Sequence, residues 1–171
     1  MAIRKIRTEG DKVLGKVCKP VTEMNRRTEE LIEDMIETMY QADGVGLAAP
    51  QVGILKRLFV VDVSEEGDNP IVFINPEIIA TDGEQTGFEG CLSIPGKSGT
   101  VTRPNYVKCR YQDINLQWQE IEGEGFMARA ILHENDHLDG HLYAEKVEGR
   151  LYTNEEIEEI LAREAEKAGQ Q

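Results

Sequence analysis

The chain has 171 residues, a formal net charge of −13 and a pI near 4.7. This length is enough for one domain with a core of its own, and no Pro/Gly/Ser-rich linker divides it, so we expect residues 1–171 to form a single domain. The excess of Asp and Glu excludes nonspecific nucleic-acid binding, which depends on clustered Lys and Arg.

The first expected element is a helix that begins at an Asn25 or Thr28 cap and ends near Gln41, before Gly44. Its apolar stripe indicates core packing and consists of Leu31, Ile32, Met35, Ile36, Met39 and Tyr40. A loop of small residues, 44–51, follows the helix.

Strands are expected next, at 57–63, 71–75 and 77–81, with a polar turn at 64–70. Residues 106–112 and 116–121 alternate well enough to predict a hairpin around 113–115.

A central helix is expected from about Gly125 to Gly140. It is apolar nearly all round before His133, which predicts burial among the strands. A last helix, 154–168, combines an apolar stripe with a solvated acidic face, and 169–171 form a frayed tail. This order predicts an α+β fold, with antiparallel strands packed around a central metal-binding helix between an N-terminal and a C-terminal helix.

The cysteine content indicates a reducing compartment. The chain has an odd number of cysteines, Cys18, Cys91 and Cys109, and no C-x-x-C pattern. The sequence contains neither an apolar signal segment nor an apolar run of membrane length, so a cytoplasmic location is expected. Cys18 and Cys109 are interpreted as small buried hydrophobic residues.

The segment His133–His137 reads H-E-N-D-H. Two histidines four residues apart project from one face of a helix and can bind one metal ion. Glu134 lies next to them, where it can take a proton from a water at the metal. The pattern therefore predicts metal-assisted hydrolysis.

A catalytic metal site usually has three protein ligands and one open position. The extended motif of many metallopeptidases fails here, because Tyr143 stands where the third His should be and His141 comes two residues early. The better candidate is Cys91, which follows Gly90 and would bind as a thiolate. A thiolate with two imidazoles suits iron or zinc better than magnesium or calcium.

A third segment, 44–51, reads G-V-G-L-A-A-P-Q and would let the backbone of a substrate come close. Gln51 at its end could donate an amide N–H to an oxygen that becomes negative during attack on a carbonyl.

In this order and at these separations, the three segments resemble the motifs of peptide deformylases. These metal amidases remove the formyl group from the initiator methionine of new chains and release formate. The family motifs G-x-G-x-A-A-x-Q, E-G-C-x-S and H-E-x-x-H occur intact at 44–51, 89–93 and 133–137.

The resemblance implies roles for individual residues. Cys91, His133 and His137 would be the metal ligands, Glu134 the proton shuttle, and Gln51 with the backbone N–H of Leu92 the oxyanion donors. Val45, Gly46 and Gly90 would hold the substrate backbone as an added strand, and Glu89 with Arg103 would form a supporting ion pair. One divalent ion is implied, with Fe²⁺ favoured and Zn²⁺, Ni²⁺ or Co²⁺ also compatible.

Helical spacing places Phe126 and Ala130 on the stripe of His133 and His137, where they would line an apolar pocket for methionine. The expected partners are N-formylmethionyl nascent peptides and, transiently, the ribosome. No signal for direct nucleic-acid or membrane binding is present.

Two other functions remain open on the residues alone. One is a zinc peptidase of the general H-E-x-x-H type, in which Cys91 is structural and the third ligand is unidentified. The other is a noncatalytic domain that a metal ion stabilises, although structural zinc sites usually have four protein ligands and only three are found here.

Overall fold

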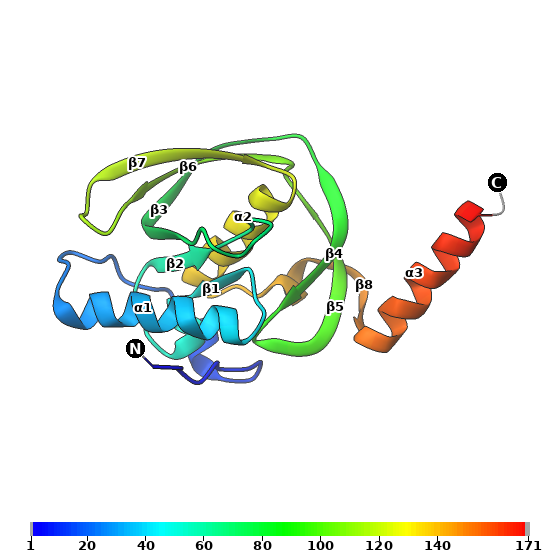
Figure 1. The fold of residues 1–171 in the computed structure, drawn as a ribbon, viewed down its shortest axis with the longest axis horizontal. Coiled ribbons are helices and arrows are strands. Elements are labelled where there is room, and N and C mark those ends of the chain that lie inside the picture. Colours follow the sequence, from blue (N-terminus) through cyan, green and yellow to red (C-terminus); the bar gives the residue numbers. More distant parts are fainter. Residues whose placement is uncertain (1, 170–171) are drawn as a thin grey trace.

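The computed structural model describes residues 2–169 (Figure 1). Its helices are α1 (Arg26–Gln41), α2 (Phe126–Leu138) and α3 (Asn154–Gly169), with 3₁₀ turns at Lys12–Gly15, Ala49–Val52 and Tyr143–Lys146. The strands are β1 (Gly46–Ala48), β2 (Leu58–Val61), β3 (Ile71–Asp82), β4 (Gln85–Cys91), β5 (Ile94–Arg103), β6 (Tyr106–Gln112), β7 (Trp118–Glu124) and β8 (Val147–Thr153). The α+β prediction is confirmed.

The strands form two antiparallel sheets. The larger sheet has the order β1-β2-β3-β6-β7, and the smaller has the order β4-β5-β8. Strands β1 and β4 are therefore edge strands, each with one side that no other strand pairs. Helix α2 lies between the sheets in Figure 1, so residues from both can reach it.

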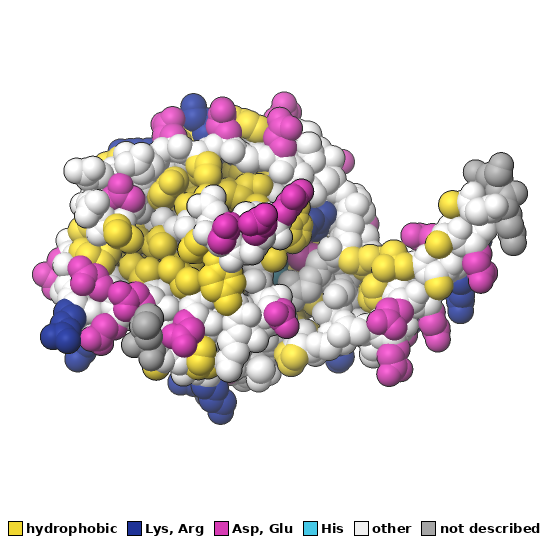
Figure 2. Space-filling view, viewed as in Figure 1, with side chains coloured by type: hydrophobic (Ala, Val, Ile, Leu, Met, Phe, Trp, Pro, Cys, Tyr) yellow, Lys and Arg dark blue, Asp and Glu magenta, His cyan; other side chains and the backbone are white. Residues whose placement is uncertain are grey.

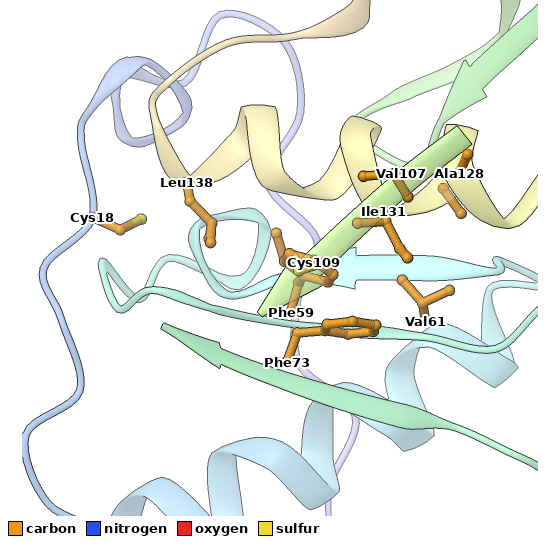
Figure 3. Packing of buried hydrophobic residues seen from close by; sticks show 11 residues of the cluster. Cys18, Phe59, Val61, Phe73, Val107, Cys109, Ala128, Ile131 and Leu138 are labelled. Carbon is orange, nitrogen blue, oxygen red and sulfur yellow. The ribbon is translucent and has the colours of Figure 1, made fainter. Parts of the chain in front are cut away.

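Helix α2 packs on one face of the larger sheet. Phe59, Phe73 and Ile131 are fully buried in this layer (Figure 3), and the two phenyl rings stack with centroids 4.7 Å apart. Cys18 and Cys109 lie in the same cluster, which confirms their interpretation as small buried hydrophobic residues. The central helix is thus held by apolar contacts, and the face that carries His133 and His137 is not part of this apolar layer.

Helix α1 covers the opposite face of the same sheet. Asn25 caps it by accepting from the N–H of Thr28, as its sequence predicts. Met35 and Met39 on its apolar stripe are fully buried with Val60 of β2. Because Phe59 faces α2 and Val60 faces α1, strand β2 is apolar throughout and buried on both sides.

The smaller sheet was missed by the sequence analysis. Strands β4 and β5 are rich in glycine and lack clear alternation, so their strand conformation depends on pairing with each other and with β8. The loop expected at 44–51 is also partly regular, since it contains β1 and a 3₁₀ turn.

Other expectations need smaller corrections. The two strands expected at 71–75 and 77–81 are one strand, β3, whose ladder is interrupted by a bulge at Asn75 and Pro76. The second hairpin strand runs over 118–124, not 116–121, because Leu116 adopts a φ of 58° in the turn. Helix α2 ends at Leu138, and Gly140, with a φ of 80°, completes the turn after it.

Helix α3 extends away from the rest of the molecule (Figure 1). It forms as expected, yet none of its residues is buried, including those of its apolar stripe. Its acidic side chains are exposed apart from the half-buried Glu156, and Figure 2 shows Asp and Glu spread over the body as well. Of the expected frayed tail, Gly169 belongs to α3 and 170–171 lie outside the described residues. Within residues 2–169, no helix is long and apolar enough to cross a membrane.

Candidate metal centre

Three side chains from two separate segments converge beside α2. The Sγ of Cys91, at the end of β4, lies 3.4 Å from Nε2 of His137. One ligand atom from each of Cys91, His133 and His137 lies within 4.8 Å of the others. Both histidines are nearly fully buried, and the ring of Tyr143 stacks on His133 at a centroid distance of 5.8 Å.

Glu89 orients His133. One oxygen of its carboxylate is paired with Nδ1 of the imidazole. Because an ionised carboxylate only accepts, Nδ1 carries a hydrogen, and Nε2 is the ring nitrogen that faces Cys91 and His137. Nε2 is therefore the atom that could bind a metal ion, in exchange for its proton.

Two arginines neutralise Glu89. Arg103 donates to both of its oxygens, and Arg129 donates to Oε2 at 2.7 Å. All three side chains are buried, and Arg103 also contacts Asp136 at 3.0 Å. Burial by itself would raise the pKa of Glu89, but the hydrogen bonds from His133 and Arg103 hold it well below its ordinary value.

The electrostatics of the centre favour a cation. Burial lowers the pKa of His133, yet the nearby Glu134, Cys91 and Glu89 raise it to about 10. Burial and the neighbouring His133 and Arg103 instead lower the pKa of His137. The cluster thus attracts one positive charge, and a soft thiolate with two imidazole nitrogens is a donor set that a divalent transition metal ion satisfies.

Glu134 lies against the backbone of β1. A Cβ at Gly46 would clash with the side chain of Glu134, so any larger residue there would displace the carboxylate. Oε2 is 3.9 Å from Nε2 of His133, while Oε1 is buried and has no hydrogen-bond partner among the described residues. Burial raises the pKa of Glu134 to about 7, so the group can exchange a proton near neutral pH.

Gln51 is buried beside the cysteine. Its Oε1 accepts from the N–H of Ala48 at 2.9 Å, which fixes the orientation of the amide. Its Nε2 therefore faces Cys91 Sγ at 3.4 Å and Ser93 Oγ at 3.0 Å. The N–H of Ser93 also points at the sulfur, at 3.4 Å. The sulfur therefore faces two N–H groups, one from the Gln51 amide and one from the backbone of Ser93.

A cavity of about 560 Å³ opens in front of this centre. Its walls include all five candidate substrate-binding residues, Val45, Gly46, Gly90, Phe126 and Ala130, together with Leu92. Ala130 is buried deep in the wall, whereas Phe126 is 54% exposed and lies at the opening. The free edges of β1 and β4 both border the cavity, so an extended chain could pair with either edge.

Arg129 and Ser93 were missed as site residues by the sequence analysis. Arg129 precedes His133 by one helical turn, in the part of the helix that is otherwise apolar, so a buried partner could have been expected from its position. Ser93 carries no comparable signal, because serines at turns are common.

A buried Cys-His-His centre beside a cavity, with a proton-exchanging carboxylate, defines a metal-dependent hydrolase. The family model of polypeptide deformylases matches residues 3–151. The chain is 66% identical to the peptide deformylase of Agathobacter rectalis, over 89% of this chain and 94% of that protein. It is 61% identical to the peptide deformylase of Lachnoclostridium phytofermentans, over 89% and 93% of the respective chains. The chain therefore belongs to the polypeptide deformylase family.

Solved structures agree with this assignment. The crystal structure of peptide deformylase from Thermotoga maritima superposes with a TM-score of 0.82 at 45% identity, covering 86% of this chain and 99% of that one. The deformylase of Synechococcus elongatus in complex with actinonin gives a TM-score of 0.81 at 44% identity, with coverages of 85% and 79%. The expected family and enzyme class are confirmed.

Proposed function

We propose that this enzyme removes the formyl group from N-formylmethionyl peptides at the centre formed by Cys91, His133 and His137. The convergence of these three ligand atoms beside the cavity is the observation that supports the proposal most directly. A divalent ion held there would supply Lewis-acid activation of water and of the formyl oxygen. The products are formate and a free N-terminal amine.

Glu134 transfers the proton from the attacking water to the departing amine. Its carboxylate is buried next to the ligands, with Oε1 unpartnered, so it can accept a proton from the attacking water. As the C–N bond breaks, the same group delivers that proton to the departing amine. A carboxyl group whose pKa lies near 7 can perform both transfers at neutral pH.

Gln51 and Leu92 stabilise the oxyanion. The Nε2 of Gln51 is held next to Cys91 by the bond between Oε1 and Ala48, so its hydrogens point into the centre. Leu92 follows Cys91 directly and lines the cavity, which supports an oxyanion role for its backbone N–H. Preorganised donors of this kind each contribute about 10²–10³ to kcat.

The peptide backbone is held between β1 and β4, at Val45, Gly46 and Gly90, while Phe126 and Ala130 enclose the methionine side chain. Main-chain pairing at a sheet edge provides affinity without selecting side chains. An apolar pocket then provides the selectivity for methionine, which suits an enzyme that acts on many different nascent chains.

We further propose Fe²⁺ as the resident ion, with Zn²⁺, Ni²⁺ or Co²⁺ able to replace it, because the thiolate and imidazole donors suit all four. The whole chain, 1–171, acts as one catalytic domain in the cytoplasm. Contact with the ribosome is transient, since α3 exposes mainly acidic side chains and offers no basic surface for RNA.

An anaerobic assay of formate release from formyl-Met-Ala-Ser, with metal quantified on the same sample, tests the proposal. We expect one free N-terminus per formate and activity proportional to the iron content. A fully metal-loaded protein that releases no formate, or that cleaves internal peptide bonds instead, would contradict it.

Two variants separate metal binding from proton transfer. Cys91→Ser should lose bound metal and activity together, because a neutral hydroxyl replaces a thiolate. Glu134→Ala should keep the fold and the metal while kcat falls by a factor on the order of 10³ or more. Full metal occupancy in Cys91→Ser would contradict the ligand set, and retained turnover in Glu134→Ala would contradict the role of the base.

A further inference from the structure

Asp62, just beyond the end of β2, joins three segments near the cavity. Its carboxylate accepts from the hydroxyl of Tyr40, in the last turn of α1, and from the backbone N–H of Asn69 at 3.1 Å. It also accepts from the N–H and the hydroxyl of Ser64. Asp62 is buried, with only 5% of the residue exposed. No part of the proposed chemistry uses this residue.

The backbone of Asp62 binds the segment that borders the cavity. Its N–H donates to the carbonyl of Val45 at 2.8 Å, one position beyond the paired residues Gly46 and Val61. Because successive residues of a strand turn their N–H and C=O groups to opposite sides, Gly46 must turn its own groups away from β2. The N–H of Ala48 confirms this alternation, since it bonds to Gln51 and not to β2. Gly46 therefore presents its backbone at the free edge.

Asp62 binds both ends of the segment 40–45. Its carboxylate accepts from the hydroxyl of Tyr40, and its backbone N–H donates to the carbonyl of Val45. Asp43 in this loop adopts a φ of 56°, in the left-handed region that helix ends use. Backbone bonds from Asp43 to Tyr40 (3.1 Å) and from Gly44 to Met39 (2.9 Å) close the end of the helix, and the contact between Tyr40 and Asp62 attaches this closed end to the residue after β2.

We propose that Asp62 and Tyr40 are positioning residues that hold β1 in register at Val45, so that the edge at Gly46 can pair with the peptide backbone of the substrate. This inference rests on the proposed substrate-binding role of β1. Neither side chain lines the cavity, and both act through the backbone of the residues that do.

The protonation states suit this function. Burial would raise the pKa of Asp62, but hydrogen bonds from Ser64 and Tyr40 lower it. Burial and Asp62 raise the pKa of Tyr40 to about 12. At neutral pH an ionised carboxylate thus accepts from a protonated phenol, which is a strong and directional contact.

Kinetics of Tyr40→Phe and Asp62→Asn, measured on the metal-loaded enzyme with formyl-Met-Ala-Ser and with formyl-methionine, test the inference. The tripeptide has a backbone that can pair with β1, whereas formyl-methionine ends after the first residue. We expect KM for the tripeptide to rise about 5-fold or more, with kcat within about twofold and a smaller rise for formyl-methionine. The double variant should show less than the product of the two single effects, because both remove the same contact.

Tyr106→Phe is the matched control. Tyr106 also donates to a carboxylate, Glu122, at 2.6 Å, but this exposed pair joins β6 to β7 and does not border the cavity. The Tyr106→Phe variant should leave KM unchanged for both substrates. Should Asp62→Asn fail to fold, Tyr40→Phe alone decides, since it removes one hydroxyl.

Two results would overturn the inference: an unchanged KM for the tripeptide in folded Tyr40→Phe, or equal increases for the two substrates. Failure of the proposed function is a separate result, because the unsubstituted enzyme would then release no formate from either substrate.

Discussion

Glu89 controls the geometry of the metal centre although it is not a ligand. It accepts from His133, Arg103 and Arg129 at once, and all four side chains are buried. A carboxylate in this position fixes the ring of the histidine and at the same time compensates two buried guanidinium groups. Its loss would remove the carboxylate that pairs with Arg129 and leave Arg103 only its contact with Asp136, which is far more costly than losing a surface ion pair.

We therefore expect Glu89→Gln to destabilise the metal-free protein by about 3–5 kcal/mol at pH 7. The folded pKa of Glu89 is depressed, so its stabilising effect is fully present above about pH 4.3 and is lost as the pH falls, by up to about 1.4 kcal/mol per pH unit. Urea unfolding of both proteins in the presence of a chelator at pH 7 and pH 3.5 measures this. A stability difference that does not shrink at pH 3.5 would contradict the assignment.

Substitution of Ala130 tests the proposed methionine pocket. It is 5% exposed in the wall of the cavity, one helical turn before the metal-site residue Glu134. Ala130→Trp should fill the pocket and reduce kcat/KM for formyl-methionyl peptides by about 100-fold or more, which corresponds to about 2.7 kcal/mol. Ala162→Trp on the exposed face of α3 is the control and should leave kcat/KM unchanged. Unchanged kcat/KM in Ala130→Trp would place the pocket elsewhere.

The site residues differ in how far sequence could predict them. The histidine pair of α2 and Glu134 follow from helical spacing alone. Cys91 and His137 are 46 positions apart, so local spacing could not predict their contact. The E-G-C-x-S motif was the only sequence feature that indicated Cys91 as a ligand. Arg129 and Asp62 could not be assigned, because a charged residue reveals its burial only when its partners in other elements are known.

At the scale of elements, the turn after α2 connects the metal-binding helix to the N-terminal segment. Gly140 has a φ of 80°, and a Cβ there would come within 2.7 Å of the backbone of Gly15. The adjacent carbonyl of Leu138 accepts from Cys18 at 2.8 Å. The end of α2 is thereby attached to the chain that precedes α1.

Gly140→Ala should consequently destabilise the protein by about 2–4 kcal/mol, from backbone strain plus the clash with Gly15. Gly149→Ala is the matched control, because Gly149 has a φ of 83° but nothing within 4 Å of the added Cβ. It should cost only about 1 kcal/mol. Thermal or urea unfolding measures both, and equal losses would show that the contact with Gly15 is unimportant.

At the scale of the whole molecule, α3 stands apart from the catalytic body. It contains no buried residue, and the family match ends at residue 151, before the helix begins. The metal centre and the cavity are built entirely from residues before 144. Figure 2 shows Asp and Glu side chains scattered over both the body and the helix, a distribution that does not indicate a specific electrostatic role.

Removal of residues 154–171 should therefore change the unfolding temperature by no more than about 2 °C and kcat/KM by no more than about twofold, since little apolar area is lost. Thermal unfolding and formate release of the shortened chain, compared with the full chain, check this. A loss of activity above tenfold would show that α3 supports the site through contacts absent from the isolated molecule.

Local patterns in the sequence predicted α1 from its helical periodicity and its Asn25 cap, and a metal-binding face from the spacing of His133 and His137, because both depend on neighbours within a few residues. The ion pair of Glu89 with Arg103 was also expected, from the family resemblance, and it is present. The sheet of β4, β5 and β8, the contact of Glu89 with Arg129 and the contact of Asp62 with Tyr40 became known from the three-dimensional structure alone. Those features depend on pairing and burial between segments distant in the chain, which no local pattern encodes.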